Sequence, residues 1–187
     1  ATKTQYDDIT IENLRGNIYI ENGTLKLSNA TLGIIGATAK MDAMYKNEGT
    51  QKAYFDYRIN ASEFDIKRAY NEIKMFREIV TAAESAEGIV GLNYSIKGVL
   101  NNQMEPVMPS LEGSGILSVK KVKMKGFKLL NVVSSKTENP DIKDPDISKV
   151  DIKTTIKNNI VTIERFKFKV AGFRLRFEGQ TSLDGKL

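Results

Sequence analysis

The sequence contains no histidine, no cysteine and no tryptophan among its 187 residues. Without histidine and cysteine, the usual zinc ligand sets cannot form. The same absences exclude histidine-based catalytic triads, cysteine nucleophiles, redox-active thiol pairs and a disulfide framework. An enzyme whose catalytic groups are only carboxylates, lysine, serine or tyrosine remains possible.

The sequence also lacks long blocks of one charge and long apolar runs. Lys and Arg number 28 against 23 Asp and Glu, a net charge of +5, which tolerates an anionic partner without requiring one. Lysines alternate with apolar residues, and no RNA-binding aromatic motif is present, so we expect no nucleic-acid partner. No apolar run approaches the roughly 20 residues of a membrane span.

The length is that of one ordinary domain, so residues 1–187 are expected to form a single β-rich domain or a fragment of a longer protein. The chain starts at Ala1 rather than Met, and its last residues, 182–187, read like the start of another strand pair. Any membrane anchor is therefore expected outside this chain.

Alternation of apolar and polar residues is the dominant pattern. It is clear from Ala37 to Tyr45 and from Ala53 to Ile59, and Asn22-Gly23 between two such runs is a strong hairpin signal. The phase of the alternation changes at Lys120-Lys121, where a turn or bulge would restore one face, and again before Phe166. Long strands joined by tight turns predict an antiparallel meander with one apolar face and one polar, solvent-exposed face.

Two segments have helical spacing instead. Apolar residues recur every three or four positions across 65–83, with Ser62 or Asp65 as the candidate cap, and a shorter helix is expected near 127–134. The fold class is therefore mainly β (α+β). We expect a long, curved antiparallel meander whose apolar face is packed by one longer and one shorter helix.

Residues 135–149 contain two prolines and few apolar residues, which predicts an exposed linker loop. Its aspartates, Asp141, Asp144 and Asp146, invite a calcium interpretation. They lack the glycine and the final glutamate of an EF-hand loop, so turn chemistry is the favoured interpretation and no metal is expected.

Catalytic motifs are not apparent. Asp7, Asp8 and Asp56 cannot be paired by sequence into an acid/base dyad, and Gly113-Ser114-Gly115 is too short for a phosphate-binding loop. We therefore expect neither an enzyme nor a cofactor. A carboxylate-based enzyme is the less favoured alternative.

The remaining candidates are an apolar surface and a basic cluster. The hairpin 166–177 is the most amphipathic piece of the chain, with Lys167, Lys169, Arg174 and Arg176 on the face opposite its apolar side chains. We expect most of these apolar residues to be buried in the hydrophobic core. The candidates for lipid contact are Phe166, Phe168, Val170, Phe173, Leu175 and Phe177. The candidates for an anionic headgroup are Lys121, Lys123 and Lys125, with solvated edge lysines as the favoured alternative.

Several motifs, in this order, resemble the AsmA-like family of envelope proteins. They are INASEFDI at 59–66, LEGSGILSV at 111–119, MKGFKLL at 124–130, and the Phe-rich closing strands with FEG at 177–179 and SLDG at 182–185. The resemblance covers about residues 7–187, and the acidic linker 135–149 departs from it.

The resemblance implies a periplasmic location in Gram-negative bacteria, with the parent protein anchored in the inner membrane. It also implies a part in outer-membrane biogenesis, with phospholipid or another envelope lipid handled along an amphipathic β-sheet. The alternative is a non-catalytic scaffold of the envelope whose hydrophobic core is fully closed.

Overall fold

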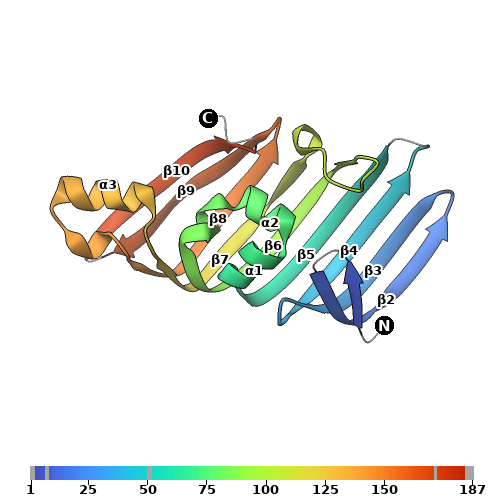
Figure 1. Ribbon diagram of the computed structural model, residues 1–187, viewed down its shortest axis with the longest axis horizontal. Helices are drawn as coiled ribbons and strands as arrows, with labels where there is room; N and C mark the ends of the chain where they lie inside the picture. The colour runs from blue at the N-terminus through green and yellow to red at the C-terminus, as the bar shows by residue number, and fades with distance from the viewer. Residues whose placement is uncertain (1–2, 7–8, 50–51, 171, 184–187) are drawn as a thin grey trace.

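The computed structural model describes residues 3–6, 9–49, 52–170 and 172–183. Ten strands form one gently curved antiparallel sheet in which each strand lies beside the next one along the chain (Figure 1). The predicted mainly-β meander is therefore confirmed. The strands are β1 (Lys3–Tyr6), β2 (Ile9–Glu21), β3 (Thr24–Ile34), β4 (Ala37–Asn47), β5 (Ala53–Asp65), β6 (Ala86–Leu100), β7 (Glu112–Met124), β8 (Asp146–Lys157), β9 (Ile160–Val170) and β10 (Phe173–Ser182).

The strand register collects the alternating apolar residues on one face. Leu25 on β3 stands opposite Ile20 on β2 and Tyr45 on β4, and Tyr45 in turn stands opposite Phe55 on β5. Charged residues occupy the opposite face, as where Asp56 stands opposite Lys97. These two surfaces are called the apolar face and the polar face below.

Turn chemistry explains why the strands return so tightly. Asn22 and Gly23 both have positive φ, 48° and 72°, which is the backbone of a type I′ turn and suits the twist of the flanking strands. The predicted hairpin at this position is confirmed. Asn158 and Asn159 repeat the same conformation between β8 and β9.

The helical segment after β5 is broken rather than continuous. It comprises α1 (Ile66–Glu72), α2 (Lys74–Ile79) and the 3₁₀ helix η1 (Thr81–Ser85). Asp65 caps α1 by accepting a hydrogen bond from the Arg68 amide at 2.7 Å, as expected for one of the two candidate caps. The expected single helix over 65–83 is wrong, because Ile73 and Val80 take extended or irregular backbone. Both are β-branched, and both pack against the core.

The segment between β7 and β8 is also more ordered than expected. Helix α3 (Lys128–Thr137) runs three residues further than the predicted 127–134, and the 3₁₀ helix η3 (Pro140–Ile142) follows. Ile142 is only 1% exposed, Pro145 is buried, and β8 already begins at Asp146. The interpretation of 135–149 as a linker loop is therefore wrong at both ends, which belong to α3 and β8, whereas most of the residues between them are exposed. The side chain of Ile142 anchors this segment in the core.

Bulges occur at the two positions where the alternation changes phase. In β7, Val119 and Lys121 pair with Val90 and Ile89, which leaves Lys120 as the extra residue. A second register shift in the β9–β10 ladder lies beside Glu178. Each bulge returns the following apolar residues to the apolar face, as the sequence pattern requires.

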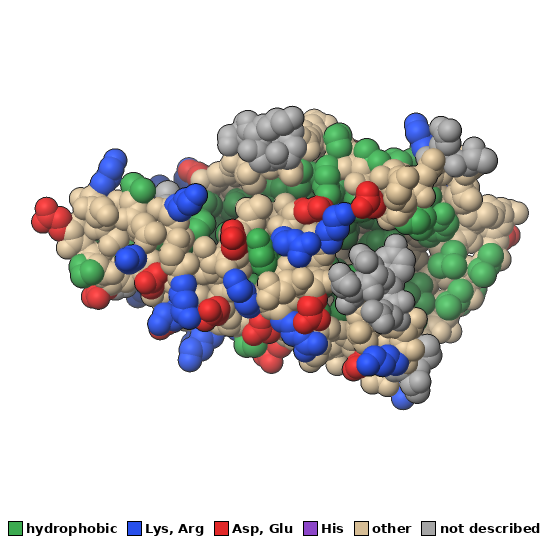
Figure 2. Space-filling model, in the orientation of Figure 1, with side chains coloured by type: hydrophobic (Ala, Val, Ile, Leu, Met, Phe, Trp, Pro, Cys, Tyr) green, Lys and Arg blue, Asp and Glu red, His purple; other side chains and the backbone are tan. Residues whose placement is uncertain are grey.

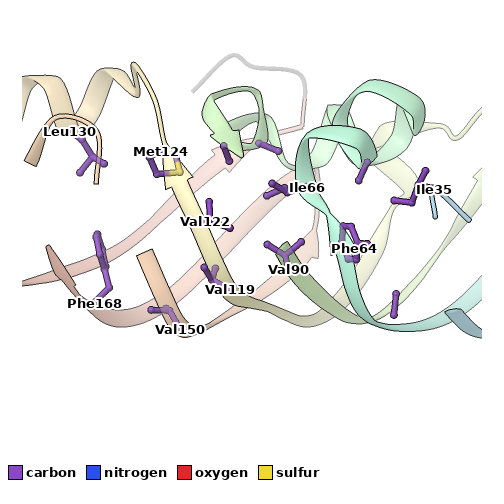
Figure 3. Close-up of a cluster of buried hydrophobic side chains, with 14 of the residues drawn as sticks. Ile35, Phe64, Ile66, Val90, Val119, Val122, Met124, Leu130, Val150 and Phe168 are labelled. Carbon is purple, nitrogen blue, oxygen red and sulfur yellow. The ribbon is translucent and has the colours of Figure 1, made fainter. Parts of the chain in front are cut away.

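The core lies between the helices and the middle of the sheet. A central cluster surrounds Val90, Val119 and Val122 beneath α1 and extends to Leu130 of α3 (Figure 3). Phe76 of α2 meets Phe64 of β5 edge to face, with ring centroids 5.9 Å apart. A second cluster forms around Phe55 and Leu111, next to the 3₁₀ helix η2 (Met108–Ser110).

Gly113 and Gly115 on β7 make room for the ring of Tyr94 on β6. A Cβ added at Gly115 would lie 2.4 Å from Tyr94 Cδ2 and 2.3 Å from the Asn93 carbonyl oxygen. The Tyr94 hydroxyl reaches across to Thr154 Oγ1 on β8 at 3.0 Å, and burial raises the pKa of this hydroxyl. The Gly-x-Gly pattern therefore has a packing role here.

This packing predicts the effect of a single methyl group. Gly115→Ala is expected to lower the free energy of unfolding by about 1–3 kcal/mol, because the neighbouring backbone must move to admit the methyl group. Urea denaturation followed by circular dichroism measures the loss. Gly179→Ala is the matched control, since nothing lies within 4 Å of the added Cβ, and an equal loss in the control would contradict this role for Gly115.

Candidate functional site

The helices are too small to cover the apolar face. Ten strands at the usual spacing span about 43 Å, and strands of 11–13 residues are about 36–44 Å long. Helices α1, α2 and α3 are only about 10, 9 and 15 Å long and each about 10 Å wide. These three helices therefore leave part of the apolar face uncovered.

The largest uncovered part lies on β2, β3 and β4. Ile20 is 76% exposed, Ile18 is 60% exposed and Leu25 is 40% exposed, although all three project from the apolar face. Their cross-strand neighbours Leu27 and Tyr45 are half-buried. These five residues are called the open apolar strip, and Figure 2 shows green side chains gathered over this end of the sheet, at the right of the view.

The strip leads without interruption into the core. Along the row formed by Ile20, Leu25, Tyr45 and Phe55, the exposed fraction falls from 76% at Ile20 to 2% at Phe55. The next row runs from Ile18 through Leu27 and Ala43 to Tyr57, and its last three side chains are half-buried. An apolar molecule on the strip would therefore contact a continuous surface rather than isolated side chains.

The hairpin residues proposed for lipid contact separate into three groups. Phe168 and Val170 are buried and belong to the central core. Three others, Phe166, Leu175 and Phe177, are half-buried. Phe173, beside the turn, is 49% exposed. The hairpin thus offers one exposed ring beside a closed interior.

Of the proposed headgroup lysines, Lys121 and Lys123 lie in β7 and Lys125 follows directly after it, and all three are exposed. Lys125 Nζ is 2.6 Å from Glu87 Oε2, and this hydrogen bond lowers the pKa of the Glu87 carboxyl. Lys123 pairs in register with Glu87 on β6 and with Asp146 on β8, whereas Lys121 pairs with Ile89 and Ser148. Acidic neighbours therefore offset part of this basic cluster.

Two shallow hollows lie on the polar face, with volumes of about 410 and 510 Å³. Arg58 lines both of them. Their walls mix amides, hydroxyls and charges of both signs, such as Lys40 beside Asp42 and Lys97 beside Glu112. This mixed lining is typical of a solvated sheet face rather than of a site for one charged ligand.

Sequence reasoning missed the open apolar strip as a site. The strip shows the same alternation as buried strands, so periodicity does not distinguish it. The element order could have indicated it. Both helical segments follow the first five strands, and neither is long enough to cover the hairpin at Asn22-Gly23, so the apolar side chains there lie exposed.

Among residues 3–6, 9–49, 52–170 and 172–183, no helix has the length and apolar character needed to cross a bilayer. The same residues contain no cluster of three or more carboxylates arranged to hold a metal ion. No family model, curated protein or solved structure matches this chain.

Proposed function

We propose that this chain is a periplasmic module of an AsmA-like envelope protein that shields or conducts phospholipid acyl chains along its apolar face. It acts without catalysis, in a parent protein anchored in the inner membrane, and serves outer-membrane biogenesis. The ordered motifs at 59–66, 111–119, 124–130 and 177–185 support the family assignment.

The open apolar strip carries the proposal. Burial of apolar surface is worth about 0.8 kcal/mol per CH₂ group, so an acyl chain laid along Ile18, Ile20 and Leu25 gains several such contributions. The row ends at Phe55, which is only 2% exposed, so an acyl chain on the strip lies directly beside the apolar core. A monomeric soluble protein rarely leaves such a patch uncovered unless something binds there.

The scaffold alternative requires the apolar face to be closed by protein. The centre of the sheet meets this condition, since Val90 and Leu111 are fully buried. The strip on β2–β4 and the ring of Phe173 do not meet it. These exposed side chains favour lipid handling over a purely structural role.

The test compares substitutions on the two faces of one strand. Ile18→Glu and Ile20→Glu place charges on the open apolar strip, whereas Tyr19→Glu places one at a 58% exposed position between them on the polar face. Phospholipid retained by the purified proteins is measured by native mass spectrometry. Loss of about two CH₂ contacts weakens binding roughly tenfold, so the two isoleucine variants should retain much less lipid than Tyr19→Glu.

All three positions are well exposed, so the variants should fold, and circular dichroism verifies this. The absence of native cysteines adds a direct measurement, because a single cysteine at position 20 or 19 can carry a photoreactive probe. Crosslinking to phospholipid from position 20 but not from position 19 is expected. Lipid-free wild-type protein, or equal lipid retention by all three variants, would contradict the proposal.

A further inference from the structure

The loop between β6 and β7, residues 101–111, leans over the end of β5 (Figure 1). At its tip, Met104 Sδ lies 3.9 Å from the hydroxyl of Tyr45 on β4, although β5 separates β4 from β6 in the sheet. Tyr45 belongs to the open apolar strip and is the member of it that pairs with β5. The tip of this loop, residues 101–105, therefore stands where the strip ends.

The root of the loop fills the apolar row with a side chain of its own. Phe55 pairs in register with Gly98 on β6, so the row that starts at Ile20 meets a glycine there. A Cβ added at Gly98 would lie 2.8 Å from Leu111 Cδ2 and 3.2 Å from Phe55 Cε1. The side chain of Leu111 thus occupies the space above Gly98, and it is fully buried. The first row is therefore closed by the loop.

The row that starts at Ile18 crosses the rest of the sheet beside this loop. Beyond Tyr57 it passes through Ile96 on β6, Gly113 on β7, Ile156 on β8 and Val161 on β9. The three apolar side chains on this stretch are buried members of the second cluster. One apolar row therefore joins the open strip to the far side of the sheet, and its middle is covered.

The cover over the second cluster has two parts that meet at an ion pair. Met75 and Ile79 of α2 and Met108 of η2 pack against the cluster. Lys74 Nζ of α2 lies 2.8 Å from Glu105 Oε1 at the tip of the loop, and both side chains are more than half exposed. Exposed ion pairs are weak, and methionine side chains repack readily. The cover can therefore open at this contact at little cost.

The tip of the loop keeps its shape through its own hydrogen bonds. The side-chain oxygen of Asn101 accepts from the amides of Gln103 and Glu105 at 3.0 and 2.9 Å. The root is tied to β6, where Ser110 Oγ accepts from the Val99 amide at 2.9 Å. These bonds do not involve α2, so loss of the ion pair frees the tip without unfolding the loop.

We propose that the tip of the β6–β7 loop is a gate on the apolar face, held shut by Lys74 and Glu105. The closed gate confines a phospholipid acyl chain to the open apolar strip. The open gate admits the chain to the row over Ile96 and Ile156. This inference rests on the proposed function, since it concerns the passage of the same lipid, and it assigns shielding to the closed state and conduction to the open state.

Single cysteines measure the motion of the gate, because the chain has no native cysteine. Ala53→Cys places a thiol in the second cluster at the base of the loop, opposite Leu100. Ala39→Cys is the matched control, since Ala39 is equally a buried alanine but belongs to the central cluster. A buried cysteine replaces alanine with one added atom, and the readout is the rate of reaction with a chromogenic, anionic aromatic disulfide.

K74E and E105K should each speed the reaction at position 53 by about two- to fivefold, the range that an exposed ion pair supports, and leave position 39 unchanged. The double variant K74E/E105K restores the pair and should return the rate to that of the parent protein. The single variants change the net charge in opposite directions, so attraction of the anionic reagent cannot accelerate both. Unchanged rates at position 53, or an equal increase at position 39, would overturn the gate.

A photoreactive lipid tests what the gate controls. In K74C/E105C the ion pair is lost, and a short bismaleimide then joins the two thiols and locks the tip to α2. The probe is a phosphatidylethanolamine whose acyl chain ends in a diazirine, and the crosslinked residues are mapped by mass spectrometry. Before locking, we expect crosslinks on the open apolar strip and at Ile96 or Ile156, and after locking on the strip alone.

The outcomes separate this inference from the proposed function. Crosslinks confined to the strip in both states, or the same deep crosslinks in both, would overturn the gate while lipid binding at the strip stands. Crosslinks nowhere on the strip would contradict the proposed function itself, and the gate with it.

Discussion

Replacing Phe168 with alanine is expected to lower the free energy of unfolding by about 3–5 kcal/mol. The ring is only 9% exposed, stacks on Phe166 at a centroid distance of 5.7 Å, and packs in the core that includes Leu130 of α3. Removing it leaves a cavity, because α3 and the sheet relax only in part. Equilibrium urea unfolding followed by circular dichroism measures the loss.

Glutamate at the same position makes the test stricter. Phe168→Glu buries a charge without a partner and should prevent folding. Phe173→Glu is the matched control on the same hairpin, and its 49% exposed position should tolerate the charge. A folded Phe168→Glu protein of near-wild-type stability would show that water or lipid reaches this ring. The proposed lipid site would then move from the open apolar strip to this hairpin.

Ile142→Ala is expected to cost about 2–5 kcal/mol, although its neighbours in sequence are prolines and aspartates. The side chain is 1% exposed and belongs to the central core, and the chain around it is held by two polar contacts. Asn139 accepts a hydrogen bond from the Asp141 amide, and Asp144 accepts one from the Gly126 amide at 2.8 Å. The loop between α3 and β8 is therefore an anchored element.

Lys143→Ala is the control for this prediction, because Lys143 is exposed and should change stability by no more than about 0.5 kcal/mol. Thermal unfolding compares the two variants, and for a chain of this size each kcal/mol lowers Tm by about 2–4 °C. Replacement of residues 139–146 by a Gly/Ser segment should cost at least as much as Ile142→Ala. A nearly neutral replacement would restore the interpretation of an exposed linker.

Local signals explain most of what could be predicted about the fold. Asn22-Gly23 specifies its turn through positive φ, and the alternation through Ala53, Phe55 and Tyr57 places those side chains on one face. The phase change at Lys120 marks a bulge because only an extra residue keeps Val119 and Val122 on the same face. Each of these features depends on a few consecutive residues.

The breaks in the helical segment and the anchored loop could not be predicted in this way. The spacing from Ile66 to Val80 fits one continuous helix, yet packing on a curved sheet favours extended backbone at Ile73. Ile142 lies among turn-forming residues, and its burial depends on β7 and α3, which are remote from that local pattern. Tertiary contacts outweigh local propensity at both places.

By itself, the sequence determined that this protein is a meander with one apolar and one charged face and no histidine or cysteine chemistry. Only the tertiary structure decided which part of the apolar face is core and which part is surface. Ile20 and Phe55 follow the same alternation and lie in the same cross-strand row, yet one is 76% exposed and the other 2%. Periodicity specifies the direction of a side chain, whereas exposure depends on what packs above it, and no helix of the described residues covers Ile20.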